Sequence, residues 1–412
     1  MQVRDNRLYL DEVPAELLAR RYGTPLYVYE EETIRRCCAE LARNIPYGSL
    51  RIHYACKANS NPAILRLFKE MGINVETVSQ GEVLLALQAG FTREQLLHTC
   101  SNMAEAELRF LVDNQIMVNL DSLGQLRRYG QLNPGAGVSI RINQGIGAGH
   151  HRHVITGGAE SKFGIHASQV AEAQALCRQH SLRLCGIHQH IGSDVLDPQI
   201  LLEAMDAQLR TAATLPDLEF VDLGGGFGVP CRHQEKPLDM RRLGPAMAAR
   251  FTRFCREYGR KLTMVLEPGR YLVAEAGTLL TTVTDVKRAP GRTFVGVDSG
   301  LNHLIRPALY GAYHQVVNAS RAEGEEEVVT IAGNICESGD LFARDRLLAR
   351  FQECDILAIL GVGAYGYSMS SNYNSRPRPA EVLVTGVHSR VIREQEPLAG
   401  DRPVCAEPHP GI

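Results

Sequence analysis

Short apolar runs alternate with longer amphipathic stretches between residues 50 and 268. The amphipathic stretches, such as NPAILRLFKEMG and SQGEVLLALQAG, place apolar residues at i, i+3 and i+4 and end in Gly, as helices do. The apolar runs with strand character are 50–55, 74–79, 95–100, 116–121, 137–143, 184–191, 218–224 and 262–268. Eight strands linked by helices predict a (β/α)8 barrel. A doubly wound parallel sheet is the alternative, because periodicity does not show whether a sheet closes.

The pattern changes after about residue 275. Strand-like runs now follow one another through loops, with few helical stretches between them, at 278–287, 292–300, 326–333, 355–363 and 380–392. This succession of strand-like runs is typical of a mostly β domain. The N-terminal run RLYLDEVP, at 7–14, is predicted to add a strand to it. The expected organisation is therefore a barrel over residues 26–274 and a β domain over 1–25 and 275–412.

Composition narrows the class of function. The chain has 412 residues, a formal net charge of -2 and no long run of one sign, which argues against nucleic acid or an anionic membrane as the partner. No apolar stretch is long enough to span a bilayer, and the N-terminus lacks the apolar segment of a signal peptide. The 11 cysteines include no CxxC pair, so reduced thiols and a cytoplasmic location are expected. A small-molecule substrate fits these properties best.

Polar residues and glycines gather where the predicted barrel strands end. Barrel enzymes carry their chemistry on the loops at the carboxyl ends of the strands. The residues are Lys57, Glu76, Glu82, Arg141, His188, His190, Ser193, Gly224, Gly225, Gly226, Gly228, Glu267, Gly269 and Arg270. They follow so many of the strands that a site at this end of the barrel is the natural interpretation.

The segment DLGGGFG, at 222–228, predicts an anion site, because bare backbone N–H groups can approach phosphate closely. A plain flexible turn is the alternative, and the neighbouring EPGR at 267–270 favours the phosphate site. Lys57 could be an ordinary salt-bridged lysine. Desolvation and nearby cations would instead leave its amine nucleophilic. A lysine, a phosphate site and a carboxylate for a ring nitrogen together describe pyridoxal phosphate held as a Schiff base.

The histidines raise the question of a metal. His188 and His190 alternate along one strand, and His150, His151 and His153 lie upstream, but no carboxylate stands at ligand spacing from them in the sequence. No metal is therefore predicted. His190 is expected to stack its ring on a flat cofactor, and His188 is expected to be a packed core histidine.

Two stretches of the expected β domain carry candidate chemistry. NICESGD, at 334–340, sets Cys336 and Glu337 among small polar residues, where a thiol is expected to face a site. LIRPALYGAYH offers Arg306 and Tyr310, a pair suited to binding a carboxylate. The glycine-rich and aromatic stretch at 363–384 is more elaborate than a turn requires.

Eight motifs resemble, in order along the chain, those of the alanine-racemase-like, pyridoxal phosphate-dependent decarboxylases. They are YACKAN, SKFG, HQHIGS, DLGGGFG, EPGR, RPALYGAYH, CESGD and GAYGYSMSSNYNSRPRPAEV. The resemblance covers nearly the whole chain. It implies a cofactor-binding barrel, a β domain and a homodimer whose active sites lie across the subunit interface.

The resemblance also implies roles for individual residues. Catalysis falls to Lys57, which binds the cofactor covalently, and to Cys336, which donates a proton from the partner subunit. The residues implied in cofactor binding are Lys57, Arg141, His190, Ser193, Gly224, Gly225, Gly226, Glu267, Gly269, Arg270 and Tyr365. Those implied in substrate binding are Arg270, Arg306, Tyr310, Glu337 and Tyr365.

The implied reaction is decarboxylation of meso-2,6-diaminopimelate to L-lysine, because Arg306 and Tyr310 suit a substrate with a distal carboxylate. The alternative within the family is a decarboxylase of ornithine, arginine, D-lysine or carboxynorspermidine. Two positions depart from the family pattern: Glu76 stands where Asp is expected, and His303 replaces an acidic residue. Both are expected to tune the site.

Overall fold

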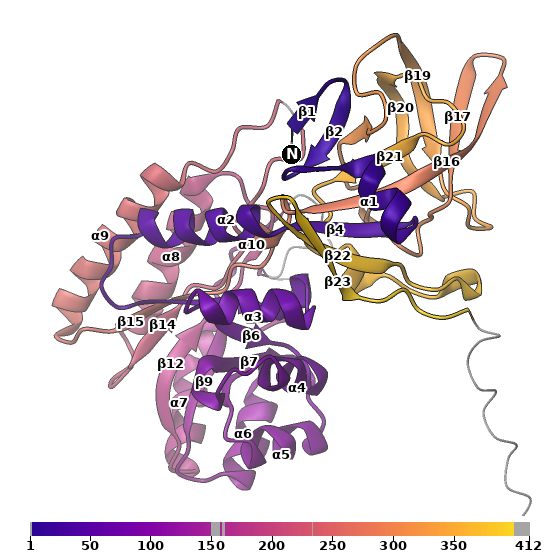
Figure 1. The fold of residues 1–412 in the computed structure, drawn as a ribbon. Coiled ribbons are helices and arrows are strands. Elements are labelled where there is room, and N and C mark those ends of the chain that lie inside the picture. Colours follow the sequence, from indigo (N-terminus) through magenta and orange to yellow (C-terminus); the bar gives the residue numbers. More distant parts are fainter. Residues whose placement is uncertain (1, 150–156, 159–160, 233, 399–412) are drawn as a thin grey trace, which may run out of the picture. The chain divides into compact units, whose positions relative to one another are not determined.

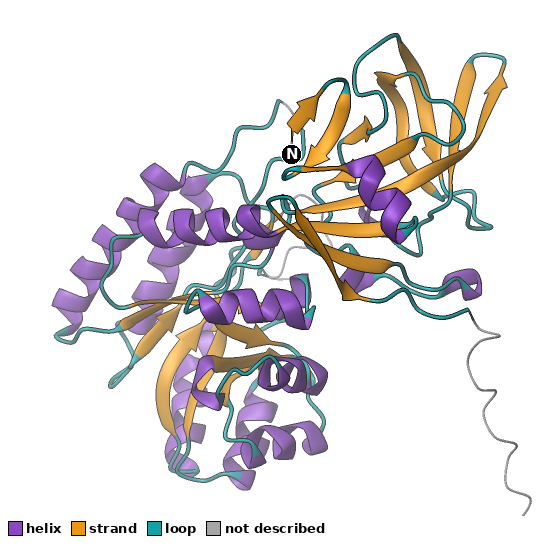
Figure 2. Ribbon diagram, viewed as in Figure 1, coloured by secondary structure: helices purple, strands orange, loops and turns teal. Residues whose placement is uncertain are grey.

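The structure, a computed structural model, describes residues 2–149, 157–158, 161–232 and 234–398. The chain divides into two compact units, which we name the barrel unit (Ile34–Ala274) and the β unit (Met1–Thr33 with Glu275–Ile412). The barrel unit alternates strands and helices, whereas the β unit consists mostly of strands (Figure 1, Figure 2). None of the helices in these described ranges has the length and apolar character needed to cross a membrane.

The barrel unit is built on a closed ring of eight parallel strands. They are β5 (Leu50–Ala55), β6 (Asn74–Thr77), β7 (Leu96–Cys100), β8 (Met117–Leu120), β9 (Gly137–Asn143), β12 (Arg183–His188), β14 (Phe220–Asp222) and β15 (Thr263–Leu266). β15 pairs with β5 and β8 pairs with β9, so the ring has no open edge. The barrel prediction is confirmed, and closure excludes the doubly wound sheet. The short strands β10 (Ala148–Gly149), β11 (Ile165–His166) and β13 (Gly192–Ser193) lie outside the ring.

Helices accompany these strands. They are α2 (Glu31–Asn44), α3 (Pro62–Glu70), α4 (Gln80–Gln88), α5 (Glu105–Asp113), α6 (Leu123–Leu132), α7 (Val170–Gln179), α8 (Pro198–Ala212), α9 (Met240–Tyr258) and α10 (Arg270–Val273). Local chemistry sets where they begin. Asn61 accepts the N–H of Ala63 ahead of α3, and Ser79 accepts that of Glu82 ahead of α4. Such caps fix the lengths of the loops that carry the polar strand ends.

The β unit is built on a mixed sheet with the strand order β20-β19-β17-β16-β4-β22-β23, and β21 pairs with both β16 and β18. Its elements are β1 (Gln2–Arg4), β2 (Arg7–Leu10), β3 (Val13–Pro14), α1 (Ala15–Tyr22), β4 (Leu26–Glu30), β16 (Gly277–Ala289), β17 (Arg292–Val297), α11 (Arg306–Tyr310), β18 (Val316–Asn318), β19 (Glu326–Ala332), β20 (Leu341–Ala349), β21 (Ile356–Leu360), β22 (Ala380–Thr385) and β23 (His388–Arg393). The expectation of a strand-rich second domain is confirmed.

The two ends of the chain share the core of the β unit. Leu8, Leu10 and Leu18 lie in one buried cluster with Leu280 of β16 and Val382 of β22, and each is at most 1% exposed. Burying a side chain of this size contributes roughly 1.5–3 kcal/mol. Apolar burial therefore joins the N-terminal segment to strands from the far end of the sequence.

One boundary differs from the prediction. Residues 26–30, expected in the barrel, form β4, which hydrogen-bonds to β16 and β22 of the β unit. All five residues of β4 are buried, so its apolar pattern suits either unit and only strand pairing decides. Strands β18 and β20 were not predicted. In β20 the charged run 344–346 interrupts the apolar alternation by which strands are recognised.

Candidate active site

Three polar side chains occupy matching positions on adjacent barrel strands. His188 of β12 is the register partner of Arg141 on β9 and of Asp222 on β14. Register partners on neighbouring strands point to the same side of a sheet. Arg141 is 7% exposed, His188 is 1% exposed and Asp222 is 0% exposed. Polar groups buried this deeply must be paired with one another or with a ligand, so this layer of the barrel is a site.

Lys57 is positioned by the 3-10 turn Cys56–Ala58 that follows β5. Its Nζ donates a hydrogen bond to Oε2 of Glu76, at 2.8 Å, and Glu76 is fully buried on β6. Burial raises the pKa of Glu76 to about 8, with Lys57 acting in the opposite direction. The glutamate at this departure from the family pattern therefore reaches the amine directly and is an unusually basic carboxylate.

His188 and Glu267 form a buried pair in which Nε2 of His188 lies 2.9 Å from Oε2 of Glu267. Burial lowers the pKa of His188, so the neutral ring donates to the carboxylate. Burial would raise the pKa of Glu267, but His188 and the charge of Lys57 bring it below its ordinary value. Glu267 is thus a buried anion.

Two expectations about the histidines need correction. His188 is not merely packed, because it hydrogen-bonds Glu267. Carboxylates also lie at ligand distance from it, since atoms of His188, Asp222 and Glu267 come within 4.8 Å of one another. Spacing along the sequence concealed this, because the three residues belong to different strands. The three upstream histidines at 150, 151 and 153 lie outside the described residues.

The glycine turn after β14 leaves no room for side chains. A Cβ on Gly224 would lie 2.1 Å from the carbonyl oxygen of Gln189, and one on Gly225 would lie 2.2 Å from that of Glu267. Gly226 has φ +96°, a conformation that side chains disfavour. Only glycine fits, so the turn packs backbone directly against the neighbouring strand ends.

The ring of His190, just after β12, is held by this turn. Its Nδ1 accepts the N–H of Gly225 at 3.3 Å, which assigns the proton of the neutral ring to Nε2. Burial, followed by the charges of Lys57 and Arg141, lowers the pKa of His190 well below its ordinary value. A neutral, flat ring in a fixed position suits stacking on an aromatic ligand.

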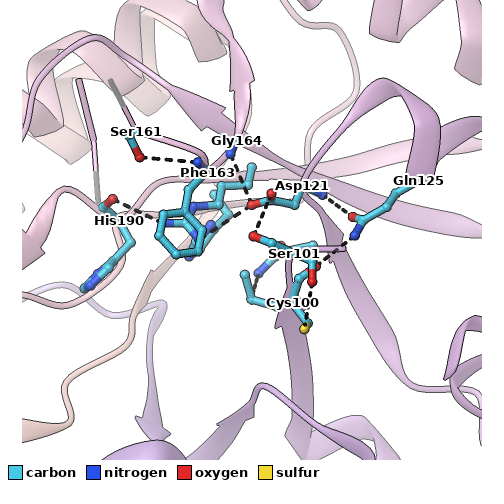
Figure 3. Close-up of polar contacts among 12 residues, drawn as sticks. Cys100, Ser101, Asp121, Gln125, Ser161, Phe163, Gly164 and His190 are labelled. Carbon is cyan, nitrogen blue, oxygen red and sulfur yellow. Dashed lines mark hydrogen bonds and ion pairs between the residues drawn. The ribbon is translucent and has the colours of Figure 1, made fainter. Parts of the chain in front are cut away.

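Arg141 is held by Asp121, which the sequence did not single out. Its Nη1 lies 3.6 Å from Oδ1 of Asp121, and both residues are buried. Asp121 also accepts hydrogen bonds from the hydroxyl of Ser101 and the N–H of Gly164 (Figure 3). The one signal in the sequence was its position at the end of the fourth predicted strand. Asp121 thereby joins the SKFG motif to the barrel.

Ser193 and Arg270 are in direct contact. Oγ of Ser193 accepts hydrogen bonds from Nε of Arg270 at 3.3 Å and from Nη2 at 3.1 Å. Arg270 also forms an ion pair with Asp194 at 3.8 Å. A Cβ on the preceding Gly269 would lie 3.1 Å from that of Ala55, so the EPGR segment sits closely against β5. These contacts join EPGR to HQHIGS, the segment that ends the sixth strand.

In the β unit, Arg306 is a buried cation beside two aromatic rings. It is the first residue of α11 and is 4% exposed. Its guanidinium carbon lies 5.6 Å from the ring centre of Tyr310 and 5.8 Å from that of Tyr365. The structure thus brings together three residues that the sequence analysis assigned to substrate binding.

Cys336 and Glu337 lie on an exposed loop after β19. The N–H of Cys336 donates to Oδ1 of Asn374 at 3.0 Å, and the hydroxyl of Tyr373 donates to Oε1 of Glu337 at 2.7 Å. Both partners belong to the 363–384 stretch. The two conspicuous stretches of the β unit are therefore neighbours in space.

Asp340 shapes this loop and was missed as a functional residue. Its Oδ1 accepts the N–H of Leu301 at 2.6 Å, and its Oδ2 accepts that of Ile335 at 2.7 Å. The signal was present, since Asp340 closes the CESGD motif. The carboxylate of Asp340 thus joins the backbone at Leu301 to the start of the loop that carries Cys336.

His303, the second departure from the family pattern, is a structural residue within the β unit. Its Nδ1 lies 3.1 Å from Oγ of Ser299, its Nε2 lies 3.1 Å from the carbonyl oxygen of Pro377, and it is 3% exposed. Burial lowers its pKa to about 4, so the ring is neutral. The imidazole bridges two segments of the unit.

The barrel residues fit pyridoxal phosphate. Lys57 supplies an amine for the aldehyde, beside a basic carboxylate. Oε1 of Glu267 is buried and receives no hydrogen bond from an N–H or hydroxyl group of any described residue, which suits the ring nitrogen. The glycine turn offers bare backbone, which suits phosphate oxygens.

Known proteins lead to the same chemistry. The family described as "Pyridoxal-dependent decarboxylase, pyridoxal binding domain" matches residues 31–274. A diaminopimelate decarboxylase of Methanothermobacter thermautotrophicus is 44% identical, over 96% of this chain and 95% of its own length. That of Escherichia coli K12 is 38% identical, over 94% and 96%. This chain belongs to the diaminopimelate decarboxylase family.

A solved structure of this family has the same fold. The crystal structure of diaminopimelate decarboxylase from M. jannaschii, in co-complex with L-lysine, is 32% identical and superposes with a TM-score of 0.90 over 98% of both chains. As a member of the pyridoxal-dependent decarboxylases, the chain is a carboxy-lyase that uses pyridoxal phosphate.

Proposed function

We propose that this chain removes one carboxylate of meso-2,6-diaminopimelate as CO2 and releases L-lysine, the last step of bacterial lysine synthesis. Similarity over nearly the full length to proteins named for this activity supports the proposal. The observation that carries it is the buried His188–Glu267 pair, which shares the barrel layer with Lys57 and Glu76.

In this proposal residues of the barrel unit, together with Tyr365 of the β unit, hold the cofactor. Lys57 binds it through the amine, and Glu267 contacts the ring nitrogen. The remaining residues proposed to hold its ring and phosphate are Arg141, His190, Ser193, Gly224, Gly225, Gly226, Gly269, Arg270 and Tyr365. When bound, pyridoxal phosphate supplies the electron-accepting ring that stabilises the electron pair left behind by CO2.

Glu267 would keep the ring nitrogen of bound pyridoxal phosphate protonated. Its own pKa lies below the ordinary value because of His188 and Lys57, although burial opposes them. A proton placed between this weakly basic carboxylate and a pyridine nitrogen therefore stays on the nitrogen. An arginine at this position would favour the unprotonated ring, which is the poorer electron acceptor.

Glu76 prepares Lys57 for its reaction. A lysine amine must lose a proton before it can attack an aldehyde. Glu76 accepts a hydrogen bond from Nζ at 2.8 Å, and burial raises its pKa to about 8, near the pH at which the proton must move. We propose that Glu76 is the base that takes this proton.

Most of the residues proposed to recognise the substrate belong to the β unit, and Arg270 belongs to the barrel unit. Arg306 and Tyr310 bind the distal carboxylate, and Glu337 binds the distal amine. Arg270 and Tyr365 complete the proposed set. A diamino acid without a distal carboxylate would lack the group proposed to bind Arg306, and we expect it to bind more weakly by about 1–3 kcal/mol.

We further propose that the chain works in the cytoplasm as a homodimer with shared active sites. Cys336 of one copy then donates the proton that replaces CO2 at the site of the other. Its exposed position on the CESGD loop leaves the thiol accessible to a second copy. A general acid of this kind contributes about 10²–10⁴-fold to a rate.

The alternative is a decarboxylase of ornithine, arginine, D-lysine or carboxynorspermidine. Steady-state CO2 release from a panel of these compounds and meso-diaminopimelate separates the two. We expect the highest kcat/KM for meso-diaminopimelate, because only it matches the Arg306 group together with Glu337. A higher kcat/KM for ornithine or D-lysine would refute the assignment.

A further inference from the structure

Asp222 lies against Glu267 in the barrel interior and has no role in the proposed reaction so far. It ends β14, is 0% exposed, and one oxygen of its carboxyl group lies within 4.8 Å of an oxygen of Glu267. Its Oδ1 also accepts the N–H of Gly224 at 2.8 Å. Asp222 therefore contacts both the acid proposed for the ring nitrogen and the glycine turn proposed for the phosphate.

Two neighbouring carboxyl groups can form a hydrogen bond with each other only if one of them carries a proton. With both ionised, Oδ2 of Asp222 and Oε1 of Glu267 are buried atoms for which the described part of the chain provides no partner. Two like charges this close in a buried site cannot both persist, and one carboxyl group retains its proton. A single proton between these two oxygens satisfies both.

The surroundings decide which acid carries the proton. Glu267 already accepts a hydrogen bond from His188 at 2.9 Å and is stabilised as an anion by the charge of Lys57. Among the described residues, the carboxyl group of Asp222 accepts its hydrogen bond from the neutral N–H of Gly224, at Oδ1. Burial, followed by the charge of Glu267, raises the pKa of Asp222 well above its ordinary value. The proton therefore belongs to Asp222.

We propose that Asp222 is a neutral carboxylic acid in the working enzyme and a positioning residue for Glu267. Its Oδ2–H donates to Glu267 while its Oδ1 holds the turn at Gly224. A carboxylate has about four acceptor sites, so Glu267 can accept from Asp222 and His188 and still contact a ring nitrogen. This inference rests on the proposed function. It adds that the side chain of Asp222 holds both Glu267, proposed to contact the ring nitrogen, and the glycine turn, proposed to contact the phosphate.

Two substitutions separate a neutral acid from an ionised one. In Asp222→Asn, Oδ1 can still accept from Gly224 and Nδ2 can still donate to Glu267, so we expect kcat and pyridoxal phosphate affinity within about tenfold of wild type. In Asp222→Ala both contacts vanish, and we expect a loss of about 10–100-fold in each. If the asparagine variant were as impaired as the alanine variant, Asp222 would need its negative charge and the proposal would be wrong.

Infrared difference spectroscopy tests the proton without reference to activity. The wild-type holoenzyme minus Asp222→Asn at pH 7 should contain the C=O band of a protonated carboxylic acid, shifted in D2O. Glu381→Gln is the matched control, because Glu381 is an equally buried carboxylate paired with Arg393. Its difference spectrum should contain only carboxylate bands. A carboxylate signature for Asp222 would overturn the proposal even if the alanine variant fails to fold.

The same experiments separate this inference from the proposed function. Wild-type protein that binds no pyridoxal phosphate, or releases no CO2 from meso-diaminopimelate, would refute the function. The infrared band, recorded on the same protein, would still decide whether Asp222 is protonated. Full activity in wild type with no protonated-acid band would leave the function intact and end the inference.

Discussion

In the barrel unit, Lys57, His188 and Glu267 make short polar contacts inside a ring of strands. In the β unit, by contrast, Cys336 and Glu337 lie on an exposed loop. The barrel residues come from separate strands and are fixed by strand register. The loop residues are neighbours in sequence, and Asn374 and Tyr373 hold them.

Burial explains the difference. A charge taken out of water must be paired, so the barrel can bury Glu267 only by surrounding it with donors such as His188. Such a network is complete within one unit. An exposed thiol carries no such requirement, and its use depends on a surface that covers it. Arg306 is the exception in the β unit, since it is buried beside aromatic rings. The comparison fits the proposal that most cofactor contacts come from the barrel unit and most substrate contacts from the β unit.

Among the substitutions considered, removal of the Lys57 side chain should reduce activity most, and it tests the barrel unit. We expect Lys57→Ala to lose at least about 10⁴-fold in CO2 release, as when a covalent nucleophile is lost. The characteristic absorbance of lysine-bound cofactor should vanish with it. Lys69→Ala is the control, because Lys69 is a lysine of α3 that contacts the carbonyl of Gly90. Near-normal turnover in Lys57→Ala would exclude any covalent role for this amine.

Cys336 tests the β unit. We expect Cys336→Ala to bind pyridoxal phosphate with wild-type affinity and to release product about 10²-fold more slowly, because only the proton donor is lost. The new hydrogen should also be delivered with less stereochemical control, which NMR of the product formed in D2O would measure. Cys354→Ala removes another exposed cysteine of the same unit and should change neither property. An unaltered rate and stereochemistry in Cys336→Ala would remove the thiol from the mechanism.

Arg306 tests the proposal that the β unit binds the distal carboxylate of the substrate. Arg306→Gln should lower kcat/KM for meso-diaminopimelate by about 10–100-fold through the loss of a buried charged hydrogen bond, with little change in cofactor affinity. Arg346→Gln is matched to it, since Arg346 also lies over a tyrosine ring, that of Tyr313 at 3.6 Å. Equal losses in both variants would mean that Arg306 acts through the stability of the fold.

Acid should destabilise both units through buried histidines. Burial lowers the pKa of His53 and His98 in the barrel unit, and of His303 in the β unit, to about 4. In the unfolded chain these rings gain a proton near their ordinary pKa, whereas in the folded chain they remain neutral until the pH is near 4. Their contribution to the free energy of unfolding is therefore complete above the ordinary pKa and is lost as the pH falls toward 4. Each histidine contributes a slope of up to about 1.4 kcal/mol per pH unit.

Urea unfolding at several pH values between 7 and 4.5 measures these slopes. His303→Gln keeps the size and polarity of the side chain but cannot protonate, so it should flatten the slope by one histidine. Burial also lowers the pKa of His188 and His190, so four such histidines lie in the barrel unit against His303 in the described part of the β unit. The barrel unit should therefore lose protection against hydrogen exchange more steeply than the β unit. A slope in His303→Gln equal to that of wild type would contradict the assignment of a neutral buried ring.

The fold was largely predictable because its signals are local. Eight strand-like runs and their helical partners follow from side-chain periodicity, and glycine-rich strand ends marked the site. The failures have physical causes. β4 is buried on both faces, so its residues do not reveal which sheet they join. β20 was hidden by the charges at 344–346, which interrupt the alternation of apolar and polar residues, and by its exposed Leu347.

Sequence alone determined which residues could do chemistry, because Lys57, Glu267 and Cys336 stand in motifs whose residue types are informative wherever they lie. Tertiary structure decided which of them act together. His188, Asp222 and Glu267 are separated along the chain and become partners only where β12, β14 and β15 end side by side. Asp121 and Asp222 look like ordinary strand-end aspartates in the sequence. Their roles come from the groups that burial forces them to face, and burial is a property of the folded barrel.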